Sequence, residues 1–273
     1  MKNSILVVIV AYYPDKGLLH RNIDAYIDDV DQILIWNNTP DDNYIESEFL
    51  NVNKIVVKGE NANKGISYAL NYAWKYAKKN GFRYLMTMDQ DTVWHNFSAF
   101  RDDVLVNRIV PTGIWAPGNE VRNTIPYDKT NFVITSGMLV SIDVLDRLQG
   151  WDERFKVDGV DNDFCCHASH LGVPIYTVNS CHIEQRCGSP EMRSFMGMKF
   201  EVHNYSASRL YEIYKNHIIT FRKYSDQKIL RKSWMHEWCY YRIFYILFEK
   251  DVLIKLIAVM RGIIVGYTRR LDK

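Results

Sequence analysis

Apolar residues occur in short, unbroken runs in the first third of the chain, and amphipathic segments separate these runs. The runs cover residues 5–12, 32–36, 54–58 and 83–88. Their β-branched composition is typical of parallel strands that are covered on both faces. Residues 17–30 and 66–80 place apolar side chains at helical spacing instead. Strands that alternate with helices predict an α/β fold with a parallel, doubly wound sheet.

The remainder of the chain is less regular. Strand-like runs occur at residues 114–116, 132–140 and 175–178, and short helices are expected at 143–149 and 162–171. From about residue 191 the pattern is mostly helical to the end. We therefore expect one α/β domain over residues 1–224 and a helical extension over residues 225–273.

The fourth apolar run ends in two carboxylates, Asp89 and Asp91, which are separated by Gln90. Ligands of open α/β sheets bind at the carboxyl ends of the strands. Two neighbouring carboxylates there repel each other unless a cation lies between them, and Mg²⁺ or Mn²⁺ carrying substrate phosphates meets that need. The alternative is an ordinary turn, because Asp is common after strands.

A second acidic cluster, Asp158, Asp161 and Asp163, immediately precedes a helical pattern. One such carboxylate could simply cap the helix. Three exceed what a cap requires, which favours a general base that takes the proton of an acceptor hydroxyl.

Missing loop motifs, net charge and cysteine content argue against several classes of protein. The first strand is not followed by a G-x-G-x-x-G or G-x-x-x-x-G-K-[ST] loop, which disfavours dinucleotide and P-loop enzymes. A net charge of +2 argues against nucleic acid as a partner. Five cysteines without a C-x-x-C pair indicate a reducing compartment, the cytoplasm.

The charge is unevenly distributed along the chain. Residues 186–273 hold 17 Lys and Arg against 8 Asp and Glu, whereas residues 1–185 hold 17 against 24. The segment 228–273 mixes its basic residues with aromatic and aliphatic ones. Such a helical segment favours an anionic membrane surface at the inner face of the cell membrane. A helical hairpin packed on the domain, or a contact between copies of the chain, is the alternative.

Six short motifs in order resemble the inverting family 2 glycosyltransferases, and within them the bacterial rhamnosyltransferase-like branch. They are the strand and turn at residues 8–14, the strand end at 33–39, the segments Asn63–Asn71, Leu85–Asp91 and Thr135–Leu139, and the acidic segment 157–165, and the match runs in order through roughly residues 5–223. Asn37 stands where the family usually has Asp, and Asp163 stands where Glu is commoner.

The resemblance implies a GT-A fold, with a single mixed, mostly parallel sheet flanked by helices. It also implies a nucleotide-diphosphate sugar donor and Mn²⁺ or Mg²⁺. Asp161 would be the catalytic base, and Asp91 would bind the metal with His182 as the third ligand. The remaining implied residues contact the donor (Tyr12, Asn37, Asn63, Lys64, Asp89, Gln90) or lie on the acceptor side and around it (Asp158, Asp163, Trp151, Ser136).

We expect a metal-dependent hexosyltransferase that acts on a glycan or a lipid-linked acceptor in cell-surface polysaccharide synthesis. The resemblance favours dTDP-rhamnose as donor, closely followed by a UDP-hexose such as UDP-galactose. Two other hypotheses of function stay open, a sugar-phosphate nucleotidyltransferase and a non-catalytic glycan-binding subunit. The nucleotidyltransferase would need a Gly-rich loop after the first strand, and Tyr12–Asp15 does not provide one.

Overall fold

The computed structural model describes residues 3–40, 44–118, 120–122, 125–185, 191–225 and 242–271. Contacts divide the chain into two compact units, one of residues 1–156 with 160–185, the other of residues 157–159 with 186–273. The sequence predicts a division at residue 224, whereas the contacts divide the chain near residue 185, where its net charge also changes sign. The aromatic-rich part of the predicted extension, residues 226–241, lies outside the described residues.

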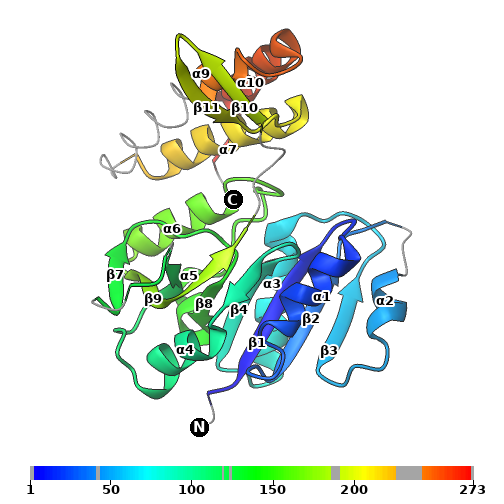
Figure 1. Ribbon diagram of the computed structural model, residues 1–273, viewed down its shortest axis with the longest axis vertical. Helices are drawn as coiled ribbons and strands as arrows, with labels where there is room; N and C mark the ends of the chain where they lie inside the picture. Colours follow the sequence, from blue (N-terminus) through cyan, green and yellow to red (C-terminus); the bar gives the residue numbers. More distant parts are fainter. Residues whose placement is uncertain are drawn as a thin grey trace. The chain divides into compact units, whose positions relative to one another are not determined.

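The first unit is built on one mixed sheet in the order β3-β2-β1-β4-β8-β6-β9-β5, with β7 paired to β9 (Figure 1). Its strands are β1 (Ile5–Ala11), β2 (Gln32–Asn37), β3 (Ile55–Gly59), β4 (Tyr84–Asp89), β5 (Val93–His95), β6 (Ile114–Gly118), β7 (Tyr127–Thr130), β8 (Met138–Ser141) and β9 (Ile175–Glu184). The first four strands in this order are mutually parallel. The mixed α/β sheet predicted from the sequence is therefore confirmed.

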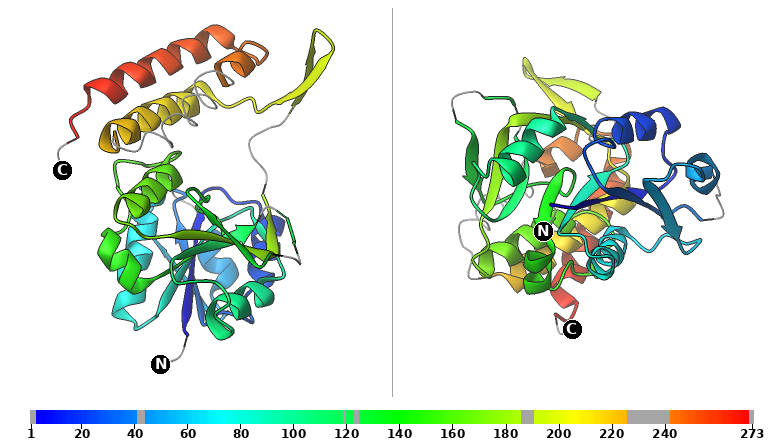
Figure 2. Two further views of the ribbon diagram at one scale, coloured as in Figure 1. Left: turned by 90° about the vertical axis from the view of Figure 1, so that its left-hand side faces the viewer. Right: turned by 90° about the horizontal axis from the view of Figure 1, so that it is seen from below.

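Helices cover both faces of this sheet. They are α1 (Lys16–Asp24), α2 (Tyr44–Phe49), α3 (Ile66–Lys79), α4 (Phe97–Arg101), the π-helix η1 (Asp102–Val106), α5 (Ile142–Leu148) and α6 (Val160–His170). Figures 1 and 2 show α1 and α3 on opposite faces of the parallel strands. This double covering explains why β1 is apolar at every position, since residues Ile5–Ile9 and Ala11 are all buried.

The strand expected over residues 132–140 is formed only at Met138–Ser141. Gly137, at its start, has a φ of +82°, and a Cβ there would lie 2.9 Å from the Pro117 ring. The backbone before β8 therefore turns away from the strand, and Gly137 N–H bonds the carbonyl of Thr87 on β4 at 2.8 Å. This bend places residues 132–136 beside the end of β4.

The second unit contains a hairpin that the sequence did not predict. Residues from 191 onward are expected to be helical, but β10 (Glu191–Phe195) and β11 (Met198–Val202) pair antiparallel. The turn between them is Met196–Gly197, and both residues have positive φ, 48° and 82°. Two such residues are what a tight hairpin turn requires, so the helical prediction for this segment is wrong.

Three helices complete the described part of the second unit, α7 (Ala207–Lys223), α9 (Arg242–Ile246) and α10 (Val252–Thr268). Two glycines of α10 bring it into close contact with α7. A Cβ at Gly262 would lie 2.6 Å from the carbonyl oxygen of Tyr211, and one at Gly266 would lie 2.7 Å from Cβ of Ile218. Because α7 packs on α10 in this way, it belongs with the C-terminal unit and not with the sheet.

Among the described residues, no helix combines the length and the apolar character needed to cross a membrane.

We expect the second unit to lose stability as the pH falls from about 6.5 to about 4. Burial, assisted by the charge of Arg242, lowers the pKa of His217 in α7 to about 4, and its Nδ1 lies 2.6 Å from the Ile213 carbonyl oxygen. The unfolded imidazole titrates near 6.5, so in this window only the unfolded chain binds the proton. The loss would reach on the order of 3 kcal/mol. Urea unfolding at several pH values measures it.

The variant His217→Gln should reduce this pH dependence by about one proton. His170→Gln, at an exposed position of α6, is the matched control and should leave it unchanged. An unchanged slope in His217→Gln would assign the acid sensitivity to another group.

Candidate active site

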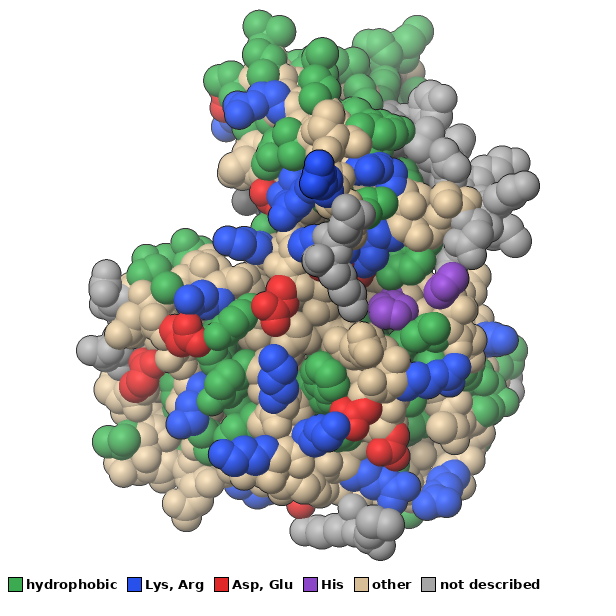
Figure 3. All heavy atoms as spheres, turned by 180° about the vertical axis from the view of Figure 1, so that it is seen from behind, with side chains coloured by type: hydrophobic (Ala, Val, Ile, Leu, Met, Phe, Trp, Pro, Cys, Tyr) green, Lys and Arg blue, Asp and Glu red, His purple; other side chains and the backbone are tan. Residues whose placement is uncertain are grey.

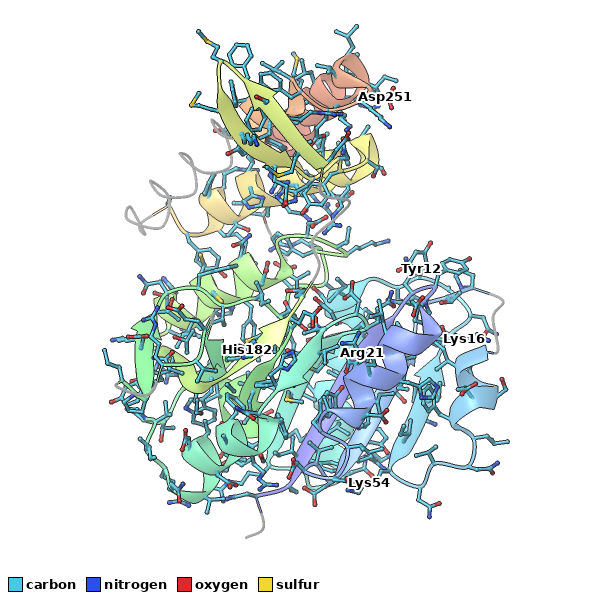
Figure 4. The ribbon with its side chains drawn as sticks, in the orientation of Figure 1. Tyr12, Lys16, Arg21, Lys54, His182 and Asp251 are labelled. Atoms are coloured by element: carbon cyan, nitrogen blue, oxygen red, sulfur yellow. The ribbon has the colours of Figure 1, made fainter. Side chains whose placement is uncertain are left out.

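The ends of β1 and β4 are joined by Gln90. Its Oε1 accepts a hydrogen bond from the Tyr12 N–H at 2.6 Å, and its Nε2 donates to the Tyr12 carbonyl at 3.1 Å. Gln90 thereby fixes the backbone of Tyr12. The Tyr12 ring remains 47% exposed at the sheet edge, where Figure 4 labels it. A predicted donor-binding residue thus presents an aromatic face at the edge where ligands of such sheets bind.

Asp89, the last residue of β4, is held from three directions. Its N–H donates to Ser136 Oγ at 3.0 Å, and its carbonyl accepts from Asn22 Nδ2 at 2.6 Å. Its carboxylate accepts a hydrogen bond from Gln185 Nε2 at 2.7 Å. The predicted residues Asp89 and Ser136 are therefore brought together. The contact with Gln185 spans 96 residues, and no local sequence signal indicates it.

The end of β2 is organised by two neighbouring asparagines. Asn37, predicted to contact the base, donates to the Glu46 carboxylate at 3.1 and 3.2 Å, and its Oδ1 accepts from Thr39 N–H at 2.9 Å. Asn38, which the sequence analysis did not select, accepts a hydrogen bond from the Lys64 N–H at 3.1 Å. The two amides hold the loop in place, and direct contact of Asn37 with a base stays a prediction.

The loop before α3 carries Asn63 and Lys64, the other two residues predicted to contact the nucleotide-sugar donor. Asn63 Oδ1 accepts from the Gly65 N–H at 3.0 Å. Lys64 Nζ pairs with Glu60 at 3.0 Å, and Tyr68 OH donates to the same carboxylate at 2.6 Å. The bond from Tyr68, followed by that from Lys64, lowers the pKa of Glu60. Lys64 is therefore paired with Glu60 at the surface.

The first turns of α3 hold the segment 151–156. Ile66 N–H bonds the Lys156 carbonyl at 2.7 Å, and Ser67 Oγ donates to the Phe155 carbonyl at 2.6 Å. Asn71 exchanges two hydrogen bonds with the backbone of Trp151, each 2.8 Å long. The Asn63–Asn71 motif therefore fixes the segment that leads into the second acidic cluster.

Asp161 and Asp163 lie in the first turn of α6. Asp163 is buried, whereas Asp161 is half-buried, and its Oδ1 accepts from the Asn162 N–H at 2.8 Å. Trp151, predicted on the acceptor side, stacks on Phe164 of α6 with ring centroids 4.7 Å apart. Its indole Nε1 is buried and has no hydrogen-bond partner within the described chain. Buried donors are normally paired, so this N–H is available to water or to a ligand.

Asp158 differs from the other members of its cluster, because it belongs to the second unit. Its carboxylate accepts hydrogen bonds from Arg209 on α7, whose Nη2 lies 3.0 Å from Oδ1 and whose Nε lies 3.2 Å from each oxygen. Burial raises the pKa of Asp158, and the Arg209 charge partly opposes that rise. This bidentate pair gives Asp158 a structural partner that the sequence did not reveal.

The first unit contains a cavity of about 580 Å³ that is lined by residues of β6, β7 and β9 and of the segment before β8. Its lining includes Pro117, Lys129, Phe132, Val133, Ile183 and Gln185. Gln185 also bonds the Asp89 carboxylate, and the Val133 carbonyl accepts a hydrogen bond from Cys165 of α6 at 3.4 Å. The cavity thus has one wall bonded to Asp89 and another bonded to α6, which carries Asp161 in its first turn.

His182, the predicted third metal ligand, lies inside β9 (Figure 4). Its ring stacks on that of His95 of β5, with ring centroids 4.5 Å apart. The register of the two strands places it beside His95, whereas Val93, the strand residue nearest to Asp91, lies opposite Glu184. Nδ1 of His182 is buried without a partner in the described chain. No group of three or more His, Cys, Asp or Glu suited to a metal forms among the described residues.

The carboxylate oxygens at the sheet edge nevertheless suit a hard cation. Asp89 and the half-buried Asp91 supply carboxylate oxygens at the end of β4. Mg²⁺ and Mn²⁺ sites that also hold substrate phosphates typically use one or two carboxylates. Asp91 is therefore consistent with the predicted metal site, and coordination by His182 stays a prediction.

Comparison with known proteins bears on the class of protein. No protein-family model matches the sequence. The chain is 22% identical over 252 residues to the dTDP-rhamnosyl transferase RfbF of Shigella flexneri, covering 82% of this chain and 81% of that protein.

Solved structures with bound nucleotides or nucleotide sugars share the fold. The structure of S. aureus TarS with UDP-GlcNAc matches 95% of this chain and 79% of its own, at a TM-score of 0.64 and 12% identity. The Pyrobaculum calidifontis mannosyltransferase PcManGT with GDP-Man and Mn²⁺ matches 93% and 73%, at a TM-score of 0.60 and 12% identity. GalNAc-T7 with UDP, GalNAc and Mn²⁺ matches 80% of this chain at a TM-score of 0.59 and 12% identity, and the chain spans only 47% of that protein.

These findings confirm the GT-A fold and the resemblance predicted from the motifs. The chain is an enzyme of the glycosyltransferase type. Among named proteins, it is similar to a dTDP-rhamnosyl transferase.

Proposed function

We propose that the protein transfers a sugar, with inversion, from a nucleotide-diphosphate donor to a hydroxyl of a glycan or lipid-linked acceptor in cell-surface polysaccharide synthesis. One observation carries this proposal. Within the first unit, the cavity is tied through Gln185 to Asp89 and through Val133 to α6, where Asp161 lies. A reacting sugar in this cavity would have a diphosphate site on one side and a carboxylate base on the other.

The donor would bind at the carboxyl ends of β1, β2 and β4. The exposed ring of Tyr12 offers a stacking surface for a base. The loop held by Asn37 follows β2, the strand beside β1. Asp89 would contact the ribose side, and Asp91 would hold Mn²⁺ or Mg²⁺ on the diphosphate. When bound, the cation neutralises charge on the departing diphosphate. Similarity to RfbF supports dTDP-rhamnose as the first donor to test, ahead of a UDP-hexose.

The acceptor would enter from the side of the cavity. Asp161 takes the proton of the acceptor hydroxyl as the new glycosidic bond forms and the bond to the diphosphate breaks. Attack from the face opposite the nucleotide inverts the anomeric centre. Trp151 stacks on Phe164 of α6, and Asp163 is buried in the first turn of that helix. Both residues would orient the Asp161 carboxylate.

Nucleotide release from a panel of donors tests this proposal. The panel contains dTDP-rhamnose, UDP-galactose, UDP-GlcNAc and GDP-mannose, each with Mn²⁺ or Mg²⁺ and a lipid-linked oligosaccharide acceptor. We expect release with one nucleotide class, stimulated by the acceptor. Failure of every donor to bind or react, measured by calorimetry alongside turnover, would overturn the proposal.

Replacement of Asp91 by Asn should lower transfer by at least about tenfold, because the neutral amide is a poor ligand for a hard cation. Titration of Mn²⁺ should show a higher concentration for half-maximal rate. Asp24→Asn, at the exposed end of α1, is the control and should behave as the wild type. Wild-type turnover by Asp91→Asn at limiting Mn²⁺ would contradict the metal assignment.

A further inference from the structure

One side of α10 is fixed against α7. Lys255, Val259, Gly262 and Gly266 are its buried residues, and a Cβ at either glycine would overlap atoms of α7. Lys255 is buried together with Glu249, with Nζ 2.7 Å from the carboxylate. This packing determines which side of α10 is left facing outward.

The outward side carries a stripe of large apolar residues. Leu253, Ile257, Met260, Ile264 and Tyr267, here called the outer stripe, have exposed fractions between 57% and 76%. They follow one another at spacings of four and three residues, which places them on one helix face. The stripe is about 21 Å long at the rise of an α-helix. A helix that is apolar on all sides is normally covered, so this face requires a partner.

The hairpin of the same unit exposes a second apolar surface. Met192, Phe195, Met196 and Met198 lie on β10, β11 and the turn between them, and Met196 at the tip is 85% exposed. Phe195 and Phe200 share one face of the hairpin, and both pack against the rings of Phe244 and Phe248. The tip at Met196 is therefore the most exposed apolar part of the hairpin. Figure 3 shows hydrophobic side chains gathered over this unit.

Basic side chains surround the outer stripe. Arg261 lies on its edge, Lys250 precedes α10, and Arg269 and Arg270 follow it, all exposed. Asp251 is the exposed acid beside them, whereas Glu249 is buried with Lys255. Residues 186–273 as a whole hold 17 Lys and Arg against 8 Asp and Glu.

We propose that α10 lies flat on an anionic lipid bilayer, with the outer stripe immersed at the boundary of headgroups and acyl chains and the hairpin tip as a second point of insertion. The basic residues at both ends of the stripe then meet anionic headgroups. Self-association through the same face would bring two strongly positive units together, which their mutual repulsion opposes. Charge complementarity therefore selects the bilayer over a second copy of the chain.

Flotation of the full chain with vesicles tests this surface. The chain should float with mixed phosphatidylcholine and phosphatidylglycerol vesicles and not with phosphatidylcholine alone, and high salt should weaken the binding. The double variant Ile257→Asp with Ile264→Asp should bind at least tenfold more weakly. Its control is Leu50→Asp with Val106→Asp, which adds the same charge at apolar positions of the first unit that are 79% and 63% exposed.

Circular dichroism verifies that all variants keep the wild-type helix content. No flotation of the intact chain with anionic vesicles would overturn the proposal, as would equal loss of binding in the control. A wild-type dimer in sedimentation analysis that the outer-stripe variant converts to a monomer, with flotation unchanged, would assign the face to a second copy instead. Flotation involves neither donor nor acceptor, so its result is independent of the proposed activity.

Discussion

Asp161→Asn is expected to lower the rate of sugar transfer on the order of 10²–10⁴-fold, the contribution typical of a positioned general base. The carboxylate lies half-buried in the first turn of α6, and the cavity wall at Val133 is bonded to the same helix. An amide of the same shape cannot take the acceptor proton. Because the proposed donor contacts lie at the ends of β1, β2 and β4, the donor dissociation constant should change little. Steady-state kinetics with calorimetry of donor binding measure both effects.

Two further substitutions make this test specific. Asp143→Asn removes an exposed carboxylate from the first turn of α5 in the same unit. It therefore reproduces the loss of a negative charge at a helix N-terminus outside the candidate active site. Asp158→Asn removes the partner of Arg209 and should chiefly lower stability, since that carboxylate is held in a bidentate pair. Asp161 would lose its assignment if Asp158→Asn abolished transfer while Asp161→Asn retained it.

The parallel half of the sheet could be predicted because each of its strands is specified locally. Unbroken apolar runs at β1 and β4 match burial on both faces, and α3 carries its apolar residues at helical spacing. The position of Asp89 at the end of an apolar run was enough to place it at the carboxyl edge. For these elements, local pattern and tertiary structure agree.

The failures lie where a distant contact decides the backbone. Gly137 interrupts the expected strand because its Cα approaches the Pro117 ring, which no property of residues 132–140 reveals. The β10–β11 hairpin lacks the Asn-Gly or Asp-Gly signal, and Met196 takes a positive φ at its turn. In both cases the sequence pattern was compatible with more than one structure.

The same distinction applies to the site. The candidate carboxylates were visible in the sequence, but the groups that hold them were not. Gln185 reaches Asp89 across 96 residues, and Arg209 reaches Asp158 across 51. The sequence predicts a strand over residues 175–178, but β9 extends to Glu184, so His182 lies within a strand and beside His95. Spacing along the chain could not determine these pairings.

Gly65→Ala should lower the free energy of unfolding on the order of 3 kcal/mol, the sum of backbone strain and steric overlap. Gly65 has φ +89°, and a Cβ there would lie 2.8 Å from both Cα and O of Lys156. Gly81→Ala is the matched control. Gly81 has φ +76° with nothing within 4 Å of the added carbon, so only the strain of about 1–2 kcal/mol applies. Urea unfolding followed by tryptophan fluorescence distinguishes the two.

The same substitution should also impair transfer in the molecules that stay folded. The Ile66 N–H and the Ser67 hydroxyl bond the carbonyls of Lys156 and Phe155, so a methyl group at residue 65 pushes away the segment that leads into α6. Asp161 would then be displaced from the acceptor, and kcat should fall at least tenfold at a temperature where the variant is folded, with donor affinity retained. Gly81→Ala should keep wild-type kcat. If Gly65→Ala lost stability but kept full kcat, the segment 151–156 would not position the base, and α6 would have to hold Asp161 through its own packing on β9.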